Sequence, residues 1–145
     1  MSLSGGCRCG AVRYTLALDR LPNTYACHCR DCQTSSGSAF SQQAPVDEAA
    51  LAVSGPLVIY EHKTADRVSS QRFCAVCHCR LFNTNSARPG LAILRAGTLD
   101  ESDKLHTVAH IWASRKQAWI TIPEGVPQWP EGPPVAEFFA AMTKG

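Results

Sequence analysis

The chain has 145 residues and a mass of 15.7 kDa, the size of one domain. It is 45% hydrophobic and 18% charged, which excludes an intrinsically disordered chain because enough apolar side chains are present to build a core. Fourteen Lys and Arg residues against twelve Asp and Glu give a formal charge of +2, too balanced for a protein that binds nucleic acid or anionic membranes. No apolar run approaches the roughly 20 residues of a membrane-spanning helix, so we expect no membrane partner.

The residue pattern along the chain predicts a mainly β fold with little helix. Apolar and polar residues alternate from Val12 to Leu18, which is typical of a half-buried strand. Further short apolar runs that predict strands are 57–60, 68–73, 91–94, 108–112 and 118–122. Turn residues separate these runs, for example at Gly55-Pro56 and at Arg88-Pro89-Gly90, as in proteins built from sheets.

Three short helical segments are expected. One turn follows Asp31, another covers Asp47 to Leu51 with Asp47 as its N-cap, and a short helix covers Ala136 to Met142. The segment Pro123 to Pro134 is rich in proline and glycine and predicts a surface coil. We expect one domain, 1–145, with this coil and the C-terminal helix as its tail.

Eight cysteines are the most unusual feature of the composition. They fall in three clusters, Cys7-Arg8-Cys9, Cys27-His28-Cys29-Arg30-Asp31-Cys32 and Cys74-Ala75-Val76-Cys77-His78-Cys79. Thiols two or three residues apart can both reach one zinc ion, whereas disulfides across such short spacings are strained. The first residues show no export signal, so we expect a cytoplasmic protein in which dense cysteine indicates metal binding. Zinc is the prediction, with disulfides, a redox Cys-x-x-Cys or an iron–sulfur cluster as alternatives.

The number of thiols leaves two ways to divide them between zinc ions. A structural zinc site has four ligands, and a catalytic site has three and an open position. The economical division joins the first and third clusters, which closes a loop of more than sixty residues. The first set is then Cys7, Cys9, Cys74 and Cys77. The second set is Cys27, Cys29 and Cys32, with its fourth position free for water or a thiol substrate. Two closed sites that use all eight thiols are the alternative.

These motifs resemble those of the glutathione-dependent formaldehyde-activating (Gfa) family, which includes centromere protein V. The resemblance rests on Gly6-Cys7-Arg8-Cys9-Gly10-Ala11-Val12-Arg13-Tyr14, on Cys27 to Gln33 with the following Ser36-Gly37-Ser38-Ala39-Phe40, and on Phe73-Cys74-Ala75-Val76-Cys77 leading to Leu81-Phe82. His110-Ile111-Trp112 and Trp119 lie where the family has its late aromatic strands. The resemblance extends from Gly6 to about Trp129.

The resemblance implies a fold of folded-over antiparallel sheets, a Gfa-like β-tent, tied at one end by a four-cysteine zinc site. It implies one structural zinc on Cys7, Cys9, Cys74 and Cys77, and a second, labile or catalytic zinc on Cys27, Cys29 and Cys32. The family's namesake reaction condenses formaldehyde with glutathione to S-hydroxymethylglutathione. We therefore expect a zinc-dependent carbon–sulfur lyase that forms or breaks an S-hydroxymethyl adduct of a small, glutathione-like thiol.

A mechanistic hypothesis follows from the three-thiol set. A small thiol would enter the open position, and its sulfur would add to a carbonyl carbon. Ser36, Gly37 and Ser38 directly follow the second cluster and are candidate substrate contacts, because backbone N–H groups and hydroxyls can donate to a developing oxyanion or to a carboxylate. The alternative is that they only form the turn that leads into the next strand.

Two further positions leave alternatives open. The third cluster continues with His78-Cys79-Arg80, where the family has a glycine and a small polar residue. Cys79 is then a buried thiol, a redox partner or a fourth ligand that closes the second site. His28 lies between two predicted ligands, and alternation directs it away from the metal as an exposed spacer, or as a base or hydrogen-bond donor behind the ligands.

Two other classes of protein compete with the enzyme interpretation. One is a zinc-stabilised binding module that performs no turnover, for which we expect two closed and inert zinc sites. The other is a thiol-redox or zinc-sensing protein that uses Cys27 to Cys32 reversibly.

Overall fold

The computed structural model describes residues 2–144 and shows a mainly β protein with little helix, as the sequence predicts. The described residues form two compact units. The first unit holds the chain up to Pro22 together with Ala44–Lys104, and the second holds Asn23–Gln43 and the chain from Leu105 onward. Among the described residues, no helix is both long and apolar enough to cross a membrane.

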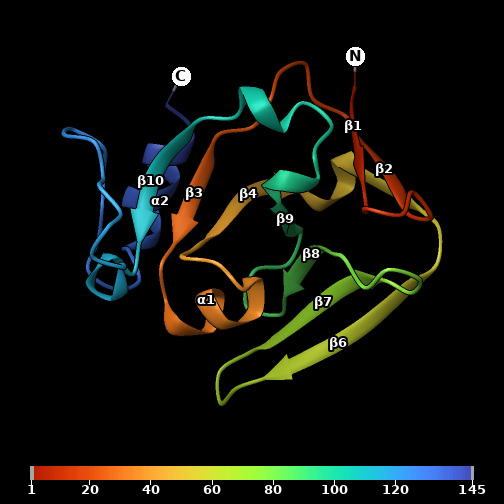
Figure 1. Ribbon diagram of the computed structural model, residues 1–145, viewed down its shortest axis with the longest axis horizontal. Coiled ribbons are helices and arrows are strands. Elements are labelled where there is room, and N and C mark those ends of the chain that lie inside the picture. Colours follow the sequence, from red (N-terminus) through yellow and green to blue (C-terminus); the bar gives the residue numbers. More distant parts are fainter. Residues whose placement is uncertain (1, 145) are drawn as a thin grey trace. The chain divides into compact units, whose positions relative to one another are not determined.

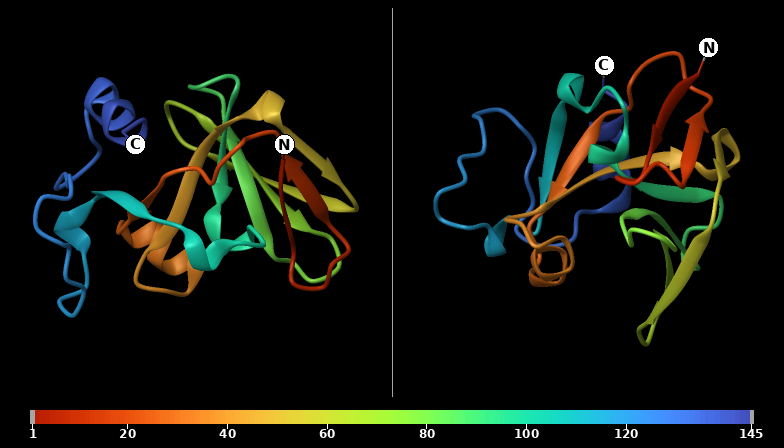
Figure 2. Two further views of the ribbon diagram at one scale, coloured as in Figure 1. Left: turned by 90° about the horizontal axis from the view of Figure 1, so that it is seen from above. Right: turned by 45° about the vertical axis from the view of Figure 1, so that its right-hand side comes forward.

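The first unit contains a three-stranded antiparallel sheet. Its strands, in sheet order, are β1 (Leu3–Gly6), β2 (Arg13–Leu16) and β5 (Leu51–Ser54). Figure 1 and the two views of Figure 2 show β1 and β2 side by side. Residues of β2 alternate between exposed and buried, as the sequence predicts, and Tyr14 and Leu16 are buried. The Tyr14 hydroxyl lies 2.8 Å from the Thr98 hydroxyl, so the polar atom of this buried ring has a hydrogen-bond partner.

A second run of strands, to which β4 contributes its residues from Ala44 onward, follows the order β4, β9, β8, β7, β6 (Figure 1). The bounds are β4 (Ser41–Asp47), β6 (Leu57–Lys63), β7 (Val68–Cys74), β8 (Arg80–Asn85) and β9 (Leu91–Arg95). Buried Leu81, Phe82 and Leu94 place the core of the unit against β8 and β9. Strand β6 forms where predicted, but its Val58 and Ile59 are 46% and 56% exposed.

Two turns of this unit lie where the sequence predicts them, and local contacts explain both. The Asp47 carboxylate accepts the Ala49 N–H at 3.1 Å and so begins the short helix η1 (Glu48–Ala50) as the predicted N-cap. Gly55 has a φ of +114°, and a Cβ there would lie 2.2 Å from the carbonyl oxygen of Ala11. Only glycine fits the turn between β5 and β6. Two more short helices follow β9, η2 (Ala96–Thr98) and η3 (Ser102–Lys104).

The second unit is built on β3 (Thr24–Cys27), which is buried along its whole length. It pairs antiparallel with the first residues of β4 and parallel with β10 (Thr107–Ile111). A parallel pair requires a long connection between its strands, and here the segment Ala44–Lys104 lies within it. The pairing joins residues of the second cysteine cluster to a strand that is distant in the sequence.

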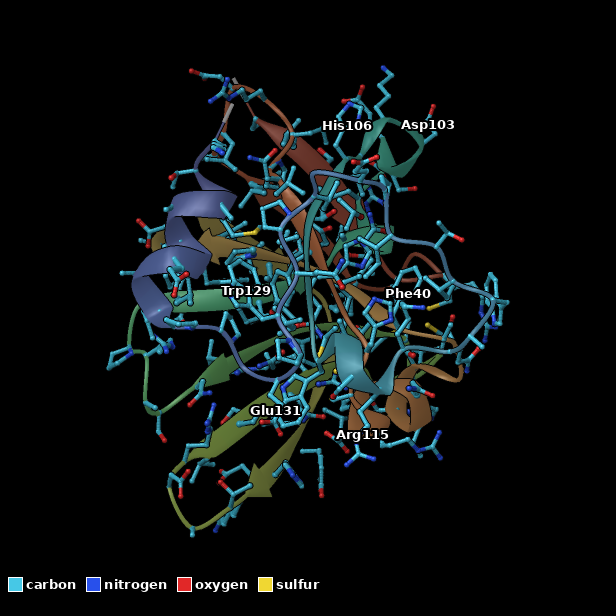
Figure 3. The ribbon with its side chains drawn as sticks, turned by 90° about the vertical axis from the view of Figure 1, so that its left-hand side faces the viewer. Phe40, Asp103, His106, Arg115, Trp129 and Glu131 are labelled. Atoms are coloured by element: carbon cyan, nitrogen blue, oxygen red, sulfur yellow. The ribbon has the colours of Figure 1, made fainter. Side chains whose placement is uncertain are left out.

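The helices of the second unit are α1 (Arg30–Ser36), η4 (Ala113–Arg115) and α2 (Val135–Met142). Helices α1 and α2 lie where the sequence predicts helical turns. The predicted coil 123–134 is confirmed, and backbone hydrogen bonds of 3.0 Å join it to β10, from His110 N–H to the Pro127 carbonyl and from Trp129 N–H to the His110 carbonyl. Trp129 lies toward α2 (Figure 3), where its ring centroid is 6.5 Å from that of Phe138.

The strand predicted at 118–122 is wrong. This segment is turn and coil, and Trp119 is 72% exposed. Local side chains satisfy its polar groups: the Trp119 indole N–H donates to the Gln117 side-chain oxygen at 2.6 Å, and the Lys116 ammonium donates to the Ile120 carbonyl at 2.7 Å. The apolar run is present, but it pairs with no strand in the part of the chain that the structure describes.

Candidate metal centres

Four cysteines of the first unit meet in one group, in which the sulfur atoms all lie within 4.8 Å of one another. They are Cys7, Cys9, Cys74 and Cys77. The sulfur of Cys9 is 3.5 Å from that of Cys7 and 3.7 Å from that of Cys74, which is 65 positions away in the sequence. Four sulfurs placed tetrahedrally about 2.3 Å from one zinc ion are about 3.8 Å apart. The group therefore fits such an ion.

The first pair of this group lies on the turn between β1 and β2. Gly10 closes the turn with a φ of +81°, which glycine adopts without strain. The Val12 N–H donates to the Cys7 sulfur at 3.3 Å, and the Ala11 N–H donates to the Cys9 sulfur at 3.4 Å. Backbone donors aimed at sulfur stabilise the thiolate form that binds metal.

The second pair lies on the turn between β7 and β8 and has the same construction. The sulfur of Cys74, a fully buried residue, accepts the Val76 N–H at 3.3 Å and the Cys77 N–H at 3.4 Å. His78 has a φ of +61°, and its N–H donates to the Cys74 carbonyl at 2.9 Å. Each pair is thus shaped by its own turn, independently of the other pair.

Protonation in this group is shared between the thiols. Burial raises the pKa of Cys7, but hydrogen bonds from the Val12 N–H and the neighbouring thiols outweigh it and bring the pKa to about 6. The Ala11 N–H lowers the pKa of Cys9, yet burial and the interaction with Cys7 raise it to about 11. The group therefore carries thiolate charge near neutral pH, and its remaining protons are those that a divalent cation would displace.

Three cysteines of the second unit form the other group, again with sulfur atoms within 4.8 Å of one another: Cys27, Cys29 and Cys32. Cys27 ends β3, and Cys29 is the N-cap of α1 with the extended conformation of such a residue, φ −63° and ψ 155°. The Cys29 sulfur accepts the Cys32 N–H at 3.3 Å, a position usually filled by a Ser or Asp oxygen. In the part of the chain that the structure describes, no fourth His, Cys, Asp or Glu joins this group.

Cys29 and Cys27 differ in acidity. Cys29 accepts hydrogen bonds from Cys27 and Cys32 and from backbone N–H groups, which brings its pKa down to about 2. The pKa of Cys27 rises strongly, because its thiol is the hydrogen-bonding partner of Cys29 and is also buried. The Cys29 thiol is therefore the more acidic of the two. Thiolate donors suit zinc among the common divalent ions, so this group also fits a zinc ion.

His28 is buried, with 0% exposure, so the interpretation as an exposed spacer is wrong. Its Nε2 lies 2.9 Å from Nδ1 of His110, which is 8% exposed. Burial lowers the pKa of both rings, that of His28 to about 4, so the pair is neutral at neutral pH. Alternation along the cluster predicts that His28 points away from the thiols. It does not predict the partner His110, because His110 lies on β10, which pairs with β3 over a long distance in the sequence.

Gln33 is a second buried polar residue that sequence reasoning missed. Its side-chain NH₂ donates to the carbonyls of His28, at 2.8 Å, and Arg115, at 3.0 Å, while its oxygen accepts the Arg30 guanidinium at 3.1 Å. Figure 3 shows Arg115 at the end of η4, next to α1. These bonds fix α1, and with it Cys29 and Cys32, against the segment that follows β10.

The predicted substrate contacts Ser36, Gly37 and Ser38 lie at the end of α1. The Ser36 hydroxyl donates to the Cys32 carbonyl at 2.7 Å, and the N–H groups of Gly37 and Ser38 both donate to the Gln33 carbonyl. These groups are therefore engaged within the turn. Gly37 and Ser38 also line a cavity of about 410 Å³, whose other lining residues are Arg30, Gln33, Thr34, Ala39 and Gln117. Arg30 and Ser38 are thus two lining residues with polar side chains.

Cys79 belongs to neither group of sulfur atoms in residues 2–144. It is half-buried, its sulfur lies 3.8 Å from the Arg80 carbonyl, and burial raises its pKa. A half-buried, protonated thiol outside the metal groups is the interpretation that agrees with this environment.

The chain also matches the model of a known protein family. The family model described as glutathione-dependent formaldehyde-activating enzyme matches residues 2–115 of the chain. The chain belongs to this family. The matched range contains every member of both sulfur groups and all three predicted substrate contacts.

A solved structure supports the fold of this family member. A crystal structure of a Rhodobacter sphaeroides protein is similar to the chain with a TM-score of 0.55 and 20% sequence identity. The similarity covers 68% of this chain and 88% of that one. At this identity it shows the fold alone. No curated protein matches the chain.

Proposed function

We propose that the protein is a zinc-dependent carbon–sulfur lyase of the formaldehyde-activating type. It would join a small thiol such as glutathione to an aldehyde such as formaldehyde, and break the same adduct in the reverse direction. The observation that carries the proposal is the difference between the two sulfur groups, four thiols in one and three in the other. Four thiolates close a zinc coordination sphere, whereas three leave a position for a substrate.

In this proposal the two groups have different roles. Cys7, Cys9, Cys74 and Cys77 hold a structural zinc ion, and Cys27, Cys29 and Cys32 hold a catalytic one. Bound to the three thiolates, the ion would keep the sulfur of a substrate thiol deprotonated near neutral pH. The reaction balances without an oxidant or reductant. The thiol sulfur forms a bond to the carbonyl carbon, the π electrons move to the oxygen, and the proton lost by the thiol completes the new hydroxyl.

The residues around α1 would orient the thiol substrate. Arg30 lies in the sequence between Cys29 and Cys32, and it is one of the residues that line the cavity beside α1. A guanidinium pairs well with the carboxylates that a glutathione-like thiol carries. Ser38 lines the same cavity, where its hydroxyl would add a donor, and Ser36 and Gly37 shape the turn that places this residue. All three of the predicted contacts therefore remain in the proposal, with Ser38 as the one that touches substrate.

The chemistry also bears on where the protein works. All eight cysteines, each within the described residues, are free thiols, and both groups need reduced sulfur to hold metal. A reducing compartment keeps thiols in that state, so we propose the cytoplasm. We also propose that both groups serve one functional domain, 1–145.

The reaction can be followed by NMR with glutathione and ¹³C-labelled formaldehyde. We expect the zinc-loaded protein to accelerate exchange between free formaldehyde and the S-hydroxymethyl adduct at least about tenfold over the spontaneous rate, which needs about 1.4 kcal/mol of barrier reduction. The effect should rise in proportion to protein concentration. A thiol without carboxylates is the matched control for substrate orientation and should be accelerated less. Exchange at the spontaneous rate with fully loaded protein would reject the activity and favour a zinc-stabilised binding module.

A further inference from the structure

Two buried polar side chains lie side by side behind the three-thiol group. Tyr25 on β3 and Gln43 on β4 are opposite each other in the antiparallel register, and each is 6% exposed. The Tyr25 hydroxyl donates to the Gln43 side-chain oxygen at 2.5 Å. Buried polar groups are costly unless paired, and this pair satisfies the hydroxyl and the amide oxygen together.

The other end of the Gln43 amide is directed at the metal group. Its nitrogen donates to the sulfur of Cys32 at 3.5 Å. The contact joins a buried residue of β4 to the thiol in the first turn of α1, eleven positions earlier in the chain. Hydrogen bonds, burial and strand register thus agree on a chain of contacts from Tyr25 through Gln43 to Cys32.

The direction of the amide has a chemical consequence. Because the Tyr25 hydroxyl donates to the Gln43 oxygen, the NH₂ group is the end that faces the sulfur. An N–H donor complements the negative charge of a metal-bound sulfur, whereas an oxygen in that place would repel it. A buried pair that served packing alone would require no donor directed at a metal-binding thiol.

We propose that Gln43 is a positioning residue of the second metal site, held in orientation by Tyr25 so that its N–H group supports the Cys32 thiolate. The inference rests on the proposed function, because it takes the three-thiol group as a metal site. A hydrogen bond to a coordinating thiolate fixes the direction of the sulfur and withdraws part of its charge. Partners of this kind, which stand behind the ligands, typically contribute 10–100-fold to metal affinity.

The test uses cobalt as the probe, in the full-length protein with zinc retained in the four-cysteine site. Cobalt is titrated into the three-thiol site of the wild type and of Gln43→Leu, Gln43→Glu and Tyr25→Phe, and two quantities are recorded. They are the cobalt affinity, by competition with a chelator, and the energy of the sulfur-to-cobalt charge-transfer band. Gln42→Leu is the matched control, because the Gln42 amide on the same strand donates to the hydroxyls of Thr24 and Thr107 instead.

We expect Gln43→Leu to weaken cobalt binding at this site by about 10–100-fold and to move the band to lower energy, since the sulfur loses its donor. Gln43→Glu, which places a carboxylate against the thiolate, should weaken it further. Tyr25→Phe should act in the same direction more weakly, and should add nothing in the Gln43→Leu background because it acts through Gln43. Gln42→Leu should leave both quantities unchanged.

Two results would overturn the inference, and they are distinguishable. If the wild type binds cobalt at the three-thiol site and Gln43→Leu shows the same affinity and band energy, Gln43 has no part in the site while the proposed function stands. If the wild type takes up no metal at the three thiols, the metal site and this inference are both rejected. A third result would also overturn the inference. If Gln43→Leu and Gln42→Leu weaken cobalt binding equally and neither shifts the band, the loss of affinity reflects a general loss of folding.

Discussion

Replacing Cys77 by serine should cost the protein at least about 3 kcal/mol of unfolding free energy and leave it largely unfolded or insoluble. Cys77 is one of four thiols whose sulfur atoms lie within 4.8 Å of one another. A zinc ion on four thiolates contributes about 10–16 kcal/mol in small domains, as much as the whole stability of a typical protein. Losing one ligand removes much of that contribution, because the pairs on two turns are no longer tied together.

Substituting Cys77 rather than Cys74 measures the loss of a metal ligand without the added cost of a buried, unpaired hydroxyl. Cys77 is only half-buried, whereas Cys74 is fully buried and a serine there would also bury an unpaired hydroxyl. Cys79→Ser is the matched control, since Cys79 lies on the same turn but outside both sulfur groups, and it should cost about 1 kcal/mol or less. Thermal unfolding followed by circular dichroism measures both variants. A Cys77→Ser protein that melts at the temperature of the Cys79→Ser protein would show that the four-thiol group does not stabilise the fold.

Replacing Cys29 by serine should have the opposite profile: formaldehyde exchange falls at least about tenfold, to the spontaneous rate, with little loss of folding. Cys29 is one of three thiols in the second group, so its removal leaves two ligands. The whole acceleration should be lost, because a ligand itself is removed rather than a residue behind a ligand. The helix α1 should remain, since Cys29 is its N-cap and serine is among the best N-cap residues.

Metal content and formaldehyde exchange check this variant together. The Cys29→Ser protein should retain one zinc ion per chain and exchange formaldehyde at the spontaneous rate. Asp31→Asn, an exposed change in the same turn, serves as the control and should keep both the activity and the metal content of the wild type. Full activity in Cys29→Ser would contradict a catalytic role for the three thiols, and unfolding as severe as that of Cys77→Ser would make the second group structural.

The caps, turns and strand alternation of this chain could be predicted from its sequence. The N-cap at Asp47, the turn at Gly55-Pro56 and the alternation along β2 each depend on neighbouring residues, and the structure has all of them. The cysteine spacings belong to the same class, because each pair is shaped by its own turn. The approach of the first cysteine cluster to the third is a long-range feature. It could be predicted because two thiols from each cluster complete the four ligands of a structural zinc site.

The features that the sequence did not reveal depend on partners that are distant along the chain. His28 is buried because β10 pairs with β3 and brings His110 to it, and no local pattern around His28 encodes that pairing. Gln33 resembles any polar residue of a short helix until the carbonyls that it bonds are known. The apolar run in β6 predicted the strand correctly but not the exposure of Val58 and Ile59. An apolar run indicates a strand, but it does not show whether another element packs over that strand.

The most direct test of two unlike metal sites is to count zinc before and after mild chelation of the intact protein. Exposure alone does not distinguish the sites, because Cys9 in the four-thiol group is exposed while Cys29 and Cys32 are half-buried. The difference lies in the number of ligands, since a chelator gains access to zinc through an open coordination position. We predict two zinc ions per chain at the start and one after treatment, with the fold intact. Two ions that resist the chelator equally would contradict an open second site.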